Sequence, residues 1–175
     1  MLPLENVIRP WHEFYALLGT ASATMVALLF VTASIASGVF TTGRRAPMRV
    51  FLSATIVHFS SVLAASLIIL APIQSRSLLA PLLLACGLFG LVYCALRWRD
   101  TIHDGLHASI DLEDRAWYIF LPVAAYLLEI GSGGLLLYRT QAACVALAVA
   151  MSMLLVIGIR NAWDITVWTI TRRGD

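Results

Sequence analysis

Long apolar blocks, rather than short periodic stripes, dominate the pattern of hydrophobic and polar positions along the chain. Each block holds at least about 20 largely apolar residues, which a helix needs to cross a hydrocarbon core of roughly 30 Å. Strands are not expected, because the apolar runs are continuous instead of alternating. The pattern predicts five spans, over residues 14–40, 50–72, 78–98, 116–138 and 142–170. We therefore predict an all-α integral membrane bundle of five transmembrane helices, forming one domain over residues 1–175.

The polar segments between the blocks are short, so consecutive helices are expected to run antiparallel. The exception is segment 99–115, which we predict to be a loop. Three arginines, Arg9, Arg76 and Arg139, lie on one predicted side, and the other nine of the 12 basic residues lie on the opposite side. Because cytoplasmic loops are enriched in Arg and Lys, this asymmetry predicts an outside N-terminus, with the C-terminus and the loop in the cytoplasm.

Composition agrees with the membrane class. Hydrophobic residues make up 60% of the chain and charged residues 13%, whereas soluble domains are about 25% charged. A net charge of +2 without a basic patch gives no indication of a nucleic-acid partner. The chain has no lysine, which excludes lysine-based Schiff-base and P-loop chemistry. No nucleophile–base pair or complete metal motif points to an enzyme, and no cofactor is expected.

Glu129 is the strongest candidate for a functional residue, because it lies near the middle of the fourth span. A charged side chain there costs about 2.5–3.5 kcal/mol on insertion scales. The glycine-rich run that follows, with Ser132 inside it, weakens a helix, and Pro122 predicts a kink. One interpretation is a locally unwound helix that forms an ion site. The other is a protonated Glu129 bonded to a neighbouring helix, with the glycines serving close packing.

Two further sets of polar groups lie inside predicted spans. His58 in the second span is either a proton-relay partner of Glu129, since histidine titrates near neutral pH, or a neutral histidine bonded to a hydroxyl, such as that of Ser61 on its own helix or one on the first span. Thr20 and Thr24 belong to a hydroxyl-rich first span. They either line an ion pathway or bond to carbonyls of their own helix.

Two stripes of small residues, spaced by four, indicate close helix packing within the bundle or between subunits; they are Gly19, Ala23 and Ala27, and Cys86, Gly90 and Cys94. The fifth apolar block is too long for a simple span, at about 43 Å for a continuous helix. It carries Arg160, Asn161 and Asp164 on what we predict to be one helical face. These residues either form an i,i+4 salt bridge or a charged ring at the mouth of an oligomeric pore.

The polar segment 99–115 contains the only candidate metal ligands. His103, His107 and Asp111 are spaced by four, so in a helix they would face roughly one way. Imidazole with carboxylate suits a divalent transition metal. The alternative is an ordinary solvated loop, since Gly105 weakens the helix that such a site requires.

The motifs Trp11-His-Glu-Phe14 and Ile159-Arg-Asn-Ala-Trp-Asp164, with the small residues of the first span between them, resemble an uncharacterised group of small bacterial membrane proteins. Some members carry a generic label as modulators of a membrane protease. The resemblance covers mainly the first and last spans, and it implies a multi-pass protein of the bacterial inner membrane.

These observations lead to two expectations of function. The first is a homo-oligomeric ion channel or ion- or proton-translocating protein, with Glu129 as the intramembrane site and His58 as its partner. The second is a non-catalytic accessory subunit that packs against a larger membrane-protein complex. In both cases the lipid bilayer is the surrounding partner.

Overall fold

The computed structural model describes residues 3–39, 45–73, 75–103 and 116–171, and these ranges are helical apart from short turns. A short helix α1 (Leu4–Ile8) and a 3-10 turn η1 (Arg9–Trp11) lead into α2 (His12–Val39). The long helices α3 (Arg45–Leu70) and α4 (Arg76–His103) follow. The π-helical turn η4 (Ala116–Phe120) then runs directly into α6 (Leu121–Leu136), and α7 (Thr140–Thr171) completes the bundle.

The helices run beyond the apolar blocks that predicted them. α3 begins at Arg45 instead of residue 50, and α4 continues to His103 instead of ending at residue 98. The predicted loops were therefore too long at these points. A hydropathy pattern marks which residues suit lipid, whereas a helix persists wherever its backbone hydrogen bonds are satisfied internally. The prediction of one continuous final helix is confirmed, because α7 has 32 residues.

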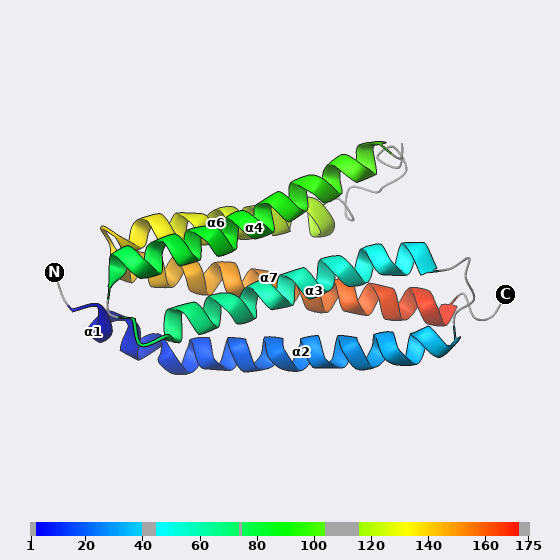
Figure 1. Cartoon of the computed structure of the whole chain (residues 1–175), viewed down its shortest axis with the longest axis horizontal. Coiled ribbons are helices and arrows are strands. Elements are labelled where there is room, and N and C mark those ends of the chain that lie inside the picture. Colours follow the sequence, from blue (N-terminus) through cyan, green and yellow to red (C-terminus); the bar gives the residue numbers. More distant parts are fainter. Residues whose placement is uncertain (1–2, 40–44, 74, 104–115, 172–175) are drawn as a thin grey trace.

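The five long helices form an antiparallel bundle with α7 near its centre (Figure 1). α6 packs most extensively against α7 and α4, and α2 packs against α3. α3 also packs against α7, whereas its contact with α4 is smaller. α3 and α6 thus each contact both α4 and α7, and each turns one face toward the interior of the bundle.

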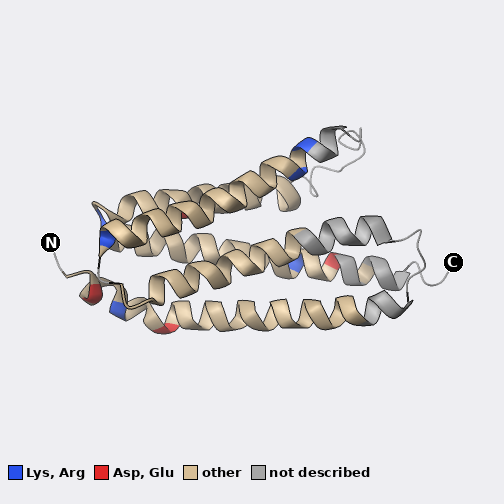
Figure 2. Cartoon of the chain, in the orientation of Figure 1, with Lys and Arg blue, Asp and Glu red and all other residues tan. Residues whose placement is uncertain are grey.

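The outer surface suits a membrane. Four helical stretches among the described residues are long and apolar enough to cross one: Leu4–Ser34, Arg76–Arg99, Ala116–Leu136 and Thr140–Asp164. The described apolar part of α3, Ala54–Leu70, is shorter. Figure 2 shows coloured charged residues mainly toward the two ends of the bundle, with a long stretch of uncharged helix between them. Large apolar side chains such as Leu17, Phe30 and Phe89 are exposed on this stretch.

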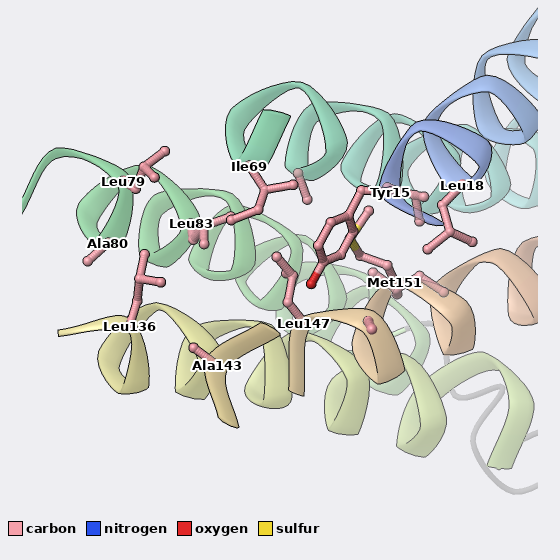
Figure 3. Close-up of a cluster of buried hydrophobic side chains, with 14 of the residues drawn as sticks. Tyr15, Leu18, Ile69, Leu79, Ala80, Leu83, Leu136, Ala143, Leu147 and Met151 are labelled. Carbon is pink, nitrogen blue, oxygen red and sulfur yellow. The ribbon is translucent and has the colours of Figure 1, made fainter. Parts of the chain in front are cut away.

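The core is apolar and is joined by hydrogen bonds between helices. Figure 3 shows Tyr15 of α2 reaching between the helices toward Leu147 and Met151 of α7. Its hydroxyl donates to the main-chain carbonyl of Cys144 at 2.7 Å. Because lipid offers no competing water, such a bond fixes how α2 lies against α7.

The small residues of the two predicted stripes are divided between interior and surface. Gly19 lies against Ser66 of α3, and Gly90 lies against the ring of Tyr126 of α6, so a side chain at either glycine would overlap its neighbour. Ala23 and Ala27 are exposed on the outside of α2. Close packing inside the bundle is thus confirmed for the two glycines.

Candidate functional site: a buried polar cluster between α3, α4 and α6

Glu129 lies on the interior face of α6 and is fully buried, with 0% of its surface exposed. Neither of its carboxyl oxygens has a hydrogen-bond partner. The structure therefore shows no hydrogen bond of good geometry from a neighbouring helix to this carboxyl. Burying an isolated carboxylate costs several kcal/mol. An ionisable group kept under these conditions inside an apolar helix bundle is a candidate functional residue.

The helix is unbroken at Glu129, so the predicted unwinding is wrong. α6 continues through Gly133 to Leu136. Gly133 lies against Leu84 and the main-chain oxygen of Ala80 on α4, where a side chain would not fit. The glycine therefore serves close approach of α4 and α6, and the packing outweighs its weak helix propensity.

Pro122 and Ser132 are the other two predicted features of this helix. Pro122 lies directly after the π-helical turn η4, and η4 and α6 form one helical stretch from Ala116 to Leu136. A π-helical turn beside a proline is the kind of local irregularity that a proline inside a helix is expected to cause. Ser132 is buried, and its hydroxyl donates to the main-chain oxygen of Glu129 at 2.6 Å. It therefore bonds to its own helix rather than to the Glu129 carboxyl.

Tyr126 joins the second and fourth predicted spans. It lies three residues before Glu129, on the same face of α6, and its side chain is fully buried. Its hydroxyl is 2.9 Å from Nδ1 of His58 on α3. The Ser61 hydroxyl lies 3.3 Å from the same oxygen. His58 is therefore bonded to a hydroxyl, as one interpretation predicted, but that hydroxyl comes from another helix.

Sequence reasoning did not select Tyr126. A signal was present, because a tyrosine three residues from an intramembrane carboxylate shares its helical face, and a buried tyrosine usually finds a hydrogen-bond partner. The partner itself depends on how α3 and α6 face each other. Helix spacing in the sequence does not contain that information.

α4 contributes the third side of the cluster. The Cys86 thiol donates to the main-chain oxygen of Ser61 at 3.8 Å. It also lies close enough to Glu129 for the two groups to interact electrostatically, although the geometry is not that of a hydrogen bond. Cys86 and Cys94 are both free thiols. We define the polar cluster as His58, Ser61, Cys86, Tyr126 and Glu129.

Thr55 and Asn161 place further polar groups toward the other end of the bundle. Gly158 of α7 lies against the ring of Phe59 on α3. Thr55 lies about one turn before Phe59, and Asn161 lies about one turn after Gly158. Because α3 and α7 are antiparallel (Figure 1), both residues lie beyond this contact toward the C-terminal end of α7. Both are buried, and neither amide atom of Asn161 has a hydrogen-bond partner. Buried polar groups therefore continue along the α3–α7 interface.

Arg160, Asn161 and Asp164 do not share one face, which corrects the prediction. Arg160 and Asp164 form the predicted i,i+4 salt bridge at 3.3 Å on the half-buried side of α7, whereas Asn161 points into the core. Successive side chains on a helix point in directions about 100° apart. Asn161 therefore points away from the side of α7 on which Arg160 lies. Tyr118 also donates to Asp164, at 3.2 Å, and Trp117 stacks with the Arg160 guanidinium at 5.0 Å.

Thr20 and Thr24 lie apart from the polar cluster. Both are exposed on α2, and their hydroxyls donate to main-chain oxygens of Ala16 and Thr20 on the same helix. A path formed within one chain does not include them. That Thr20 and Thr24 line an ion pathway in an assembly of several chains stays a prediction.

The proposed metal ligands lie in a part of the chain that is not described. His107 and Asp111 fall outside the described residues, and the side chain of His103 does so as well. Among the described residues, no group of three or more His, Cys, Asp or Glu side chains could hold a metal ion.

The geometry of the polar cluster suits proton transfer. Carboxylic acid, phenol, imidazole and alcohol groups each donate and accept protons or hydrogen bonds. Comparison of the chain with models of known protein families, with curated proteins and with solved structures finds no match. The resemblance to small bacterial inner-membrane proteins thus stays a prediction, and function must be inferred from the residues themselves.

Proposed function

We propose that the protein translocates protons across a membrane, with Glu129 as the proton-carrying group and Tyr126 and His58 as the next members of the relay. One observation carries the proposal: a fully buried carboxyl without a hydrogen-bond partner lies one turn from a hydrogen-bonded tyrosine–histidine pair. An ionisable group at such a position is costly and marks proton relays in pumps and transporters.

A proton suits this cluster better than a metal cation. Hard cations take about six or more oxygen ligands, whereas Glu129 supplies the only carboxylate of the polar cluster. The side chains around it instead carry exchangeable protons. Because Glu129 has no hydrogen-bond partner, transfer toward Tyr126 requires a rotation of its side chain or a bridging water.

The polar cluster covers the central part of the membrane. Glu129 lies seven residues before the end of α6, about 11 Å along the helix axis, and His58 lies 12 residues before the end of α3, about 18 Å. The buried Thr55 and Asn161 extend this series toward the opposite surface. In this proposal a proton reaches Glu129 from the Arg139 end and leaves past His58.

The proposal includes five membrane crossings. α3 has 26 residues, about 39 Å of helix, enough to span a hydrocarbon core of roughly 30 Å. With α3 counted beside the four longer apolar stretches, the ends of the bundle lie on opposite sides, and the arginine distribution supports an outside N-terminus and a cytoplasmic C-terminus. We further propose a bacterial inner-membrane location and a homo-oligomer in which each chain has its own pathway.

Proton flux into liposomes tests the proposal. The full chain is reconstituted with a pH-sensitive dye inside, and a potassium gradient with valinomycin supplies the driving voltage. Wild-type vesicles should acidify faster than empty ones, Glu129→Gln should reduce the rate to the empty-vesicle level, and Tyr126→Phe should reduce it at least tenfold. Glu13→Gln, an exposed carboxylate at the start of α2, is the matched control and should retain flux. Wild-type flux equal to that of empty vesicles refutes the function.

An accessory role is the second candidate, and the exposed side of α2 favours it. Ala23 and Ala27 form a small-residue stripe on the outside of the bundle. Such stripes allow a second helix to approach closely in lipid. Purification in a mild detergent separates the two functions: a stoichiometric partner protein that is lost on Ala23→Leu supports an accessory subunit, whereas a homo-oligomer alone supports the proton pathway.

A further inference from the structure

An open groove runs along the outer face of α7, with the start of α2 near one end and the start of α6 near the other. Its volume is about 520 Å³. Trp11 and Phe14 line the groove toward Cys144, Trp117 and Leu121 line it toward Arg160, and the floor consists of α7 residues from Val145 to Ile157. Apart from Ser152 of the floor, these residues are apolar.

A second hollow of about 540 Å³ continues this groove at the turn between α6 and α7. Val145 lines both hollows. The second one is more polar than the first, because Arg76, Arg139 and Thr140 contribute to its wall. The apolar groove therefore leads at this end to two guanidinium groups, one from the start of α4 and one from the turn between α6 and α7.

The geometry points to a binding site for one anionic phospholipid, with an acyl chain in the groove and the phosphate at Arg76 and Arg139. The groove floor from Val145 to Ile157 covers 12 residue steps, about 18 Å of helix. One leaflet contributes roughly half of a 30 Å hydrocarbon core, about 15 Å. Val149 lies 10 residue steps after Arg139, about 15 Å. An acyl chain that starts at the Arg139 surface therefore reaches the part of the groove from Val145 to Val149, and the groove itself continues beyond the membrane centre.

The two arginines favour a phospholipid over a partner helix as the occupant of the groove. Arginine binds phosphate through a planar set of donors, and basic pockets at the membrane surface recognise anionic headgroups. The apolar face of a transmembrane helix would gain little from two arginines at this level.

Native mass spectrometry of the delipidated full chain tests this inference. Phosphatidylglycerol and phosphatidylcholine with the same acyl chains are titrated separately. A surface arginine contributes about fivefold to the affinity for an anionic lipid, so Arg76→Gln with Arg139→Gln should weaken phosphatidylglycerol binding about 25-fold. The same change should leave phosphatidylcholine binding unaffected. Arg9→Gln, an exposed arginine at the same end of the bundle that lines neither hollow, should have less than a twofold effect.

A second variant tests the apolar part without touching the arginines. Val149 lies in the groove and is 46% exposed, and Val92 on α4 is 49% exposed outside it. Val149→Trp should weaken binding of both lipids at least fivefold, whereas Val92→Trp should not. Equal affinity for the two lipids, unchanged binding by the double arginine variant, or unchanged binding by Val149→Trp would each overturn the inference. Cross-linking from position 149 to another protein chain in membranes, instead of to lipid, would also overturn it. None of these outcomes depends on proton flux.

Discussion

Replacing Gly90 by alanine is expected to disturb the polar cluster through packing alone. A Cβ at this position would overlap the ring of Tyr126. Overpacking of this kind typically costs about 1–3 kcal/mol, whereas the better helix propensity of alanine returns up to about 1 kcal/mol. The net loss of stability is then about 0–3 kcal/mol. Equilibrium unfolding in mixed detergent micelles measures it.

Gly131→Ala is the matched control, because no atom lies within 4 Å of a Cβ at that position. The propensity gain cancels between the two variants, so Gly90→Ala should be less stable than Gly131→Ala by the full overpacking cost of about 1–3 kcal/mol. Equal stability of the two variants would show that Tyr126 does not occupy the described position. The explanation would then fail, whatever the effect on flux.

The same substitution separates packing from chemistry. A displaced Tyr126 ring loses the hydroxyl contact with His58, which measures 2.9 Å in the structure, so proton flux should fall. Combining Gly90→Ala with Tyr126→Leu removes the overlap, and the double variant should be more stable than the sum of the two single changes by about 0.5–3 kcal/mol. Strictly additive changes would argue against direct contact between the two side chains.

The remaining predictions concern three other polar positions. Glu129→Met replaces a buried carboxyl without partners by an apolar side chain of similar length, and should raise stability by about 1–3 kcal/mol while abolishing flux; a loss of stability would mean that the carboxyl has a partner after all. Tyr15→Phe removes the hydrogen bond to the Cys144 carbonyl and should cost about 0.6 kcal/mol, the average for such bonds in membranes, whereas Tyr138→Phe at a side chain 75% exposed should cost nothing measurable in the same titration. Asp164→Asn weakens a salt bridge between partly exposed side chains and should change stability by less than about 1 kcal/mol; a larger loss would identify a desolvated pair.

The sequence predicted the helices because lipid imposes the same requirement on every residue of a span. Each residue must satisfy its backbone internally and present an apolar side chain, so long apolar blocks indicate helices without knowledge of neighbours. The burial of Glu129 followed from the same rule, since a carboxylate in a span faces the interior. The ends of α3 and α4 were missed because backbone hydrogen bonding continues after hydropathy has fallen.

The composition of the cluster could not be predicted in this way. His58 had several hydroxyl partners within reach by sequence, and the arrangement of the helices in the bundle brings Tyr126 of α6 to it. The glycines after Glu129 had two physical meanings, weak helix or close packing, and the contact of Gly133 with α4 decided between them. Asn161 was predicted to share one helical face with its charged neighbours, but its burial depends on the α3–α7 interface.

The length of α7 fixes the electrical position of Glu129. From Thr140 to Arg160 there are 20 residue steps, about 30 Å, which equals the thickness of the hydrocarbon core. Glu129 lies about 11 Å from the Arg139 side, roughly a third of the way across. One elementary charge moved through 100 mV changes its free energy by about 2.3 kcal/mol. A proton that moves from the Arg139 surface to Glu129 crosses about a third of this voltage, so its free energy changes by about 0.8 kcal/mol. In the proposed function, a membrane voltage of this size alters proton occupancy of Glu129 about fourfold, and the site itself senses the field.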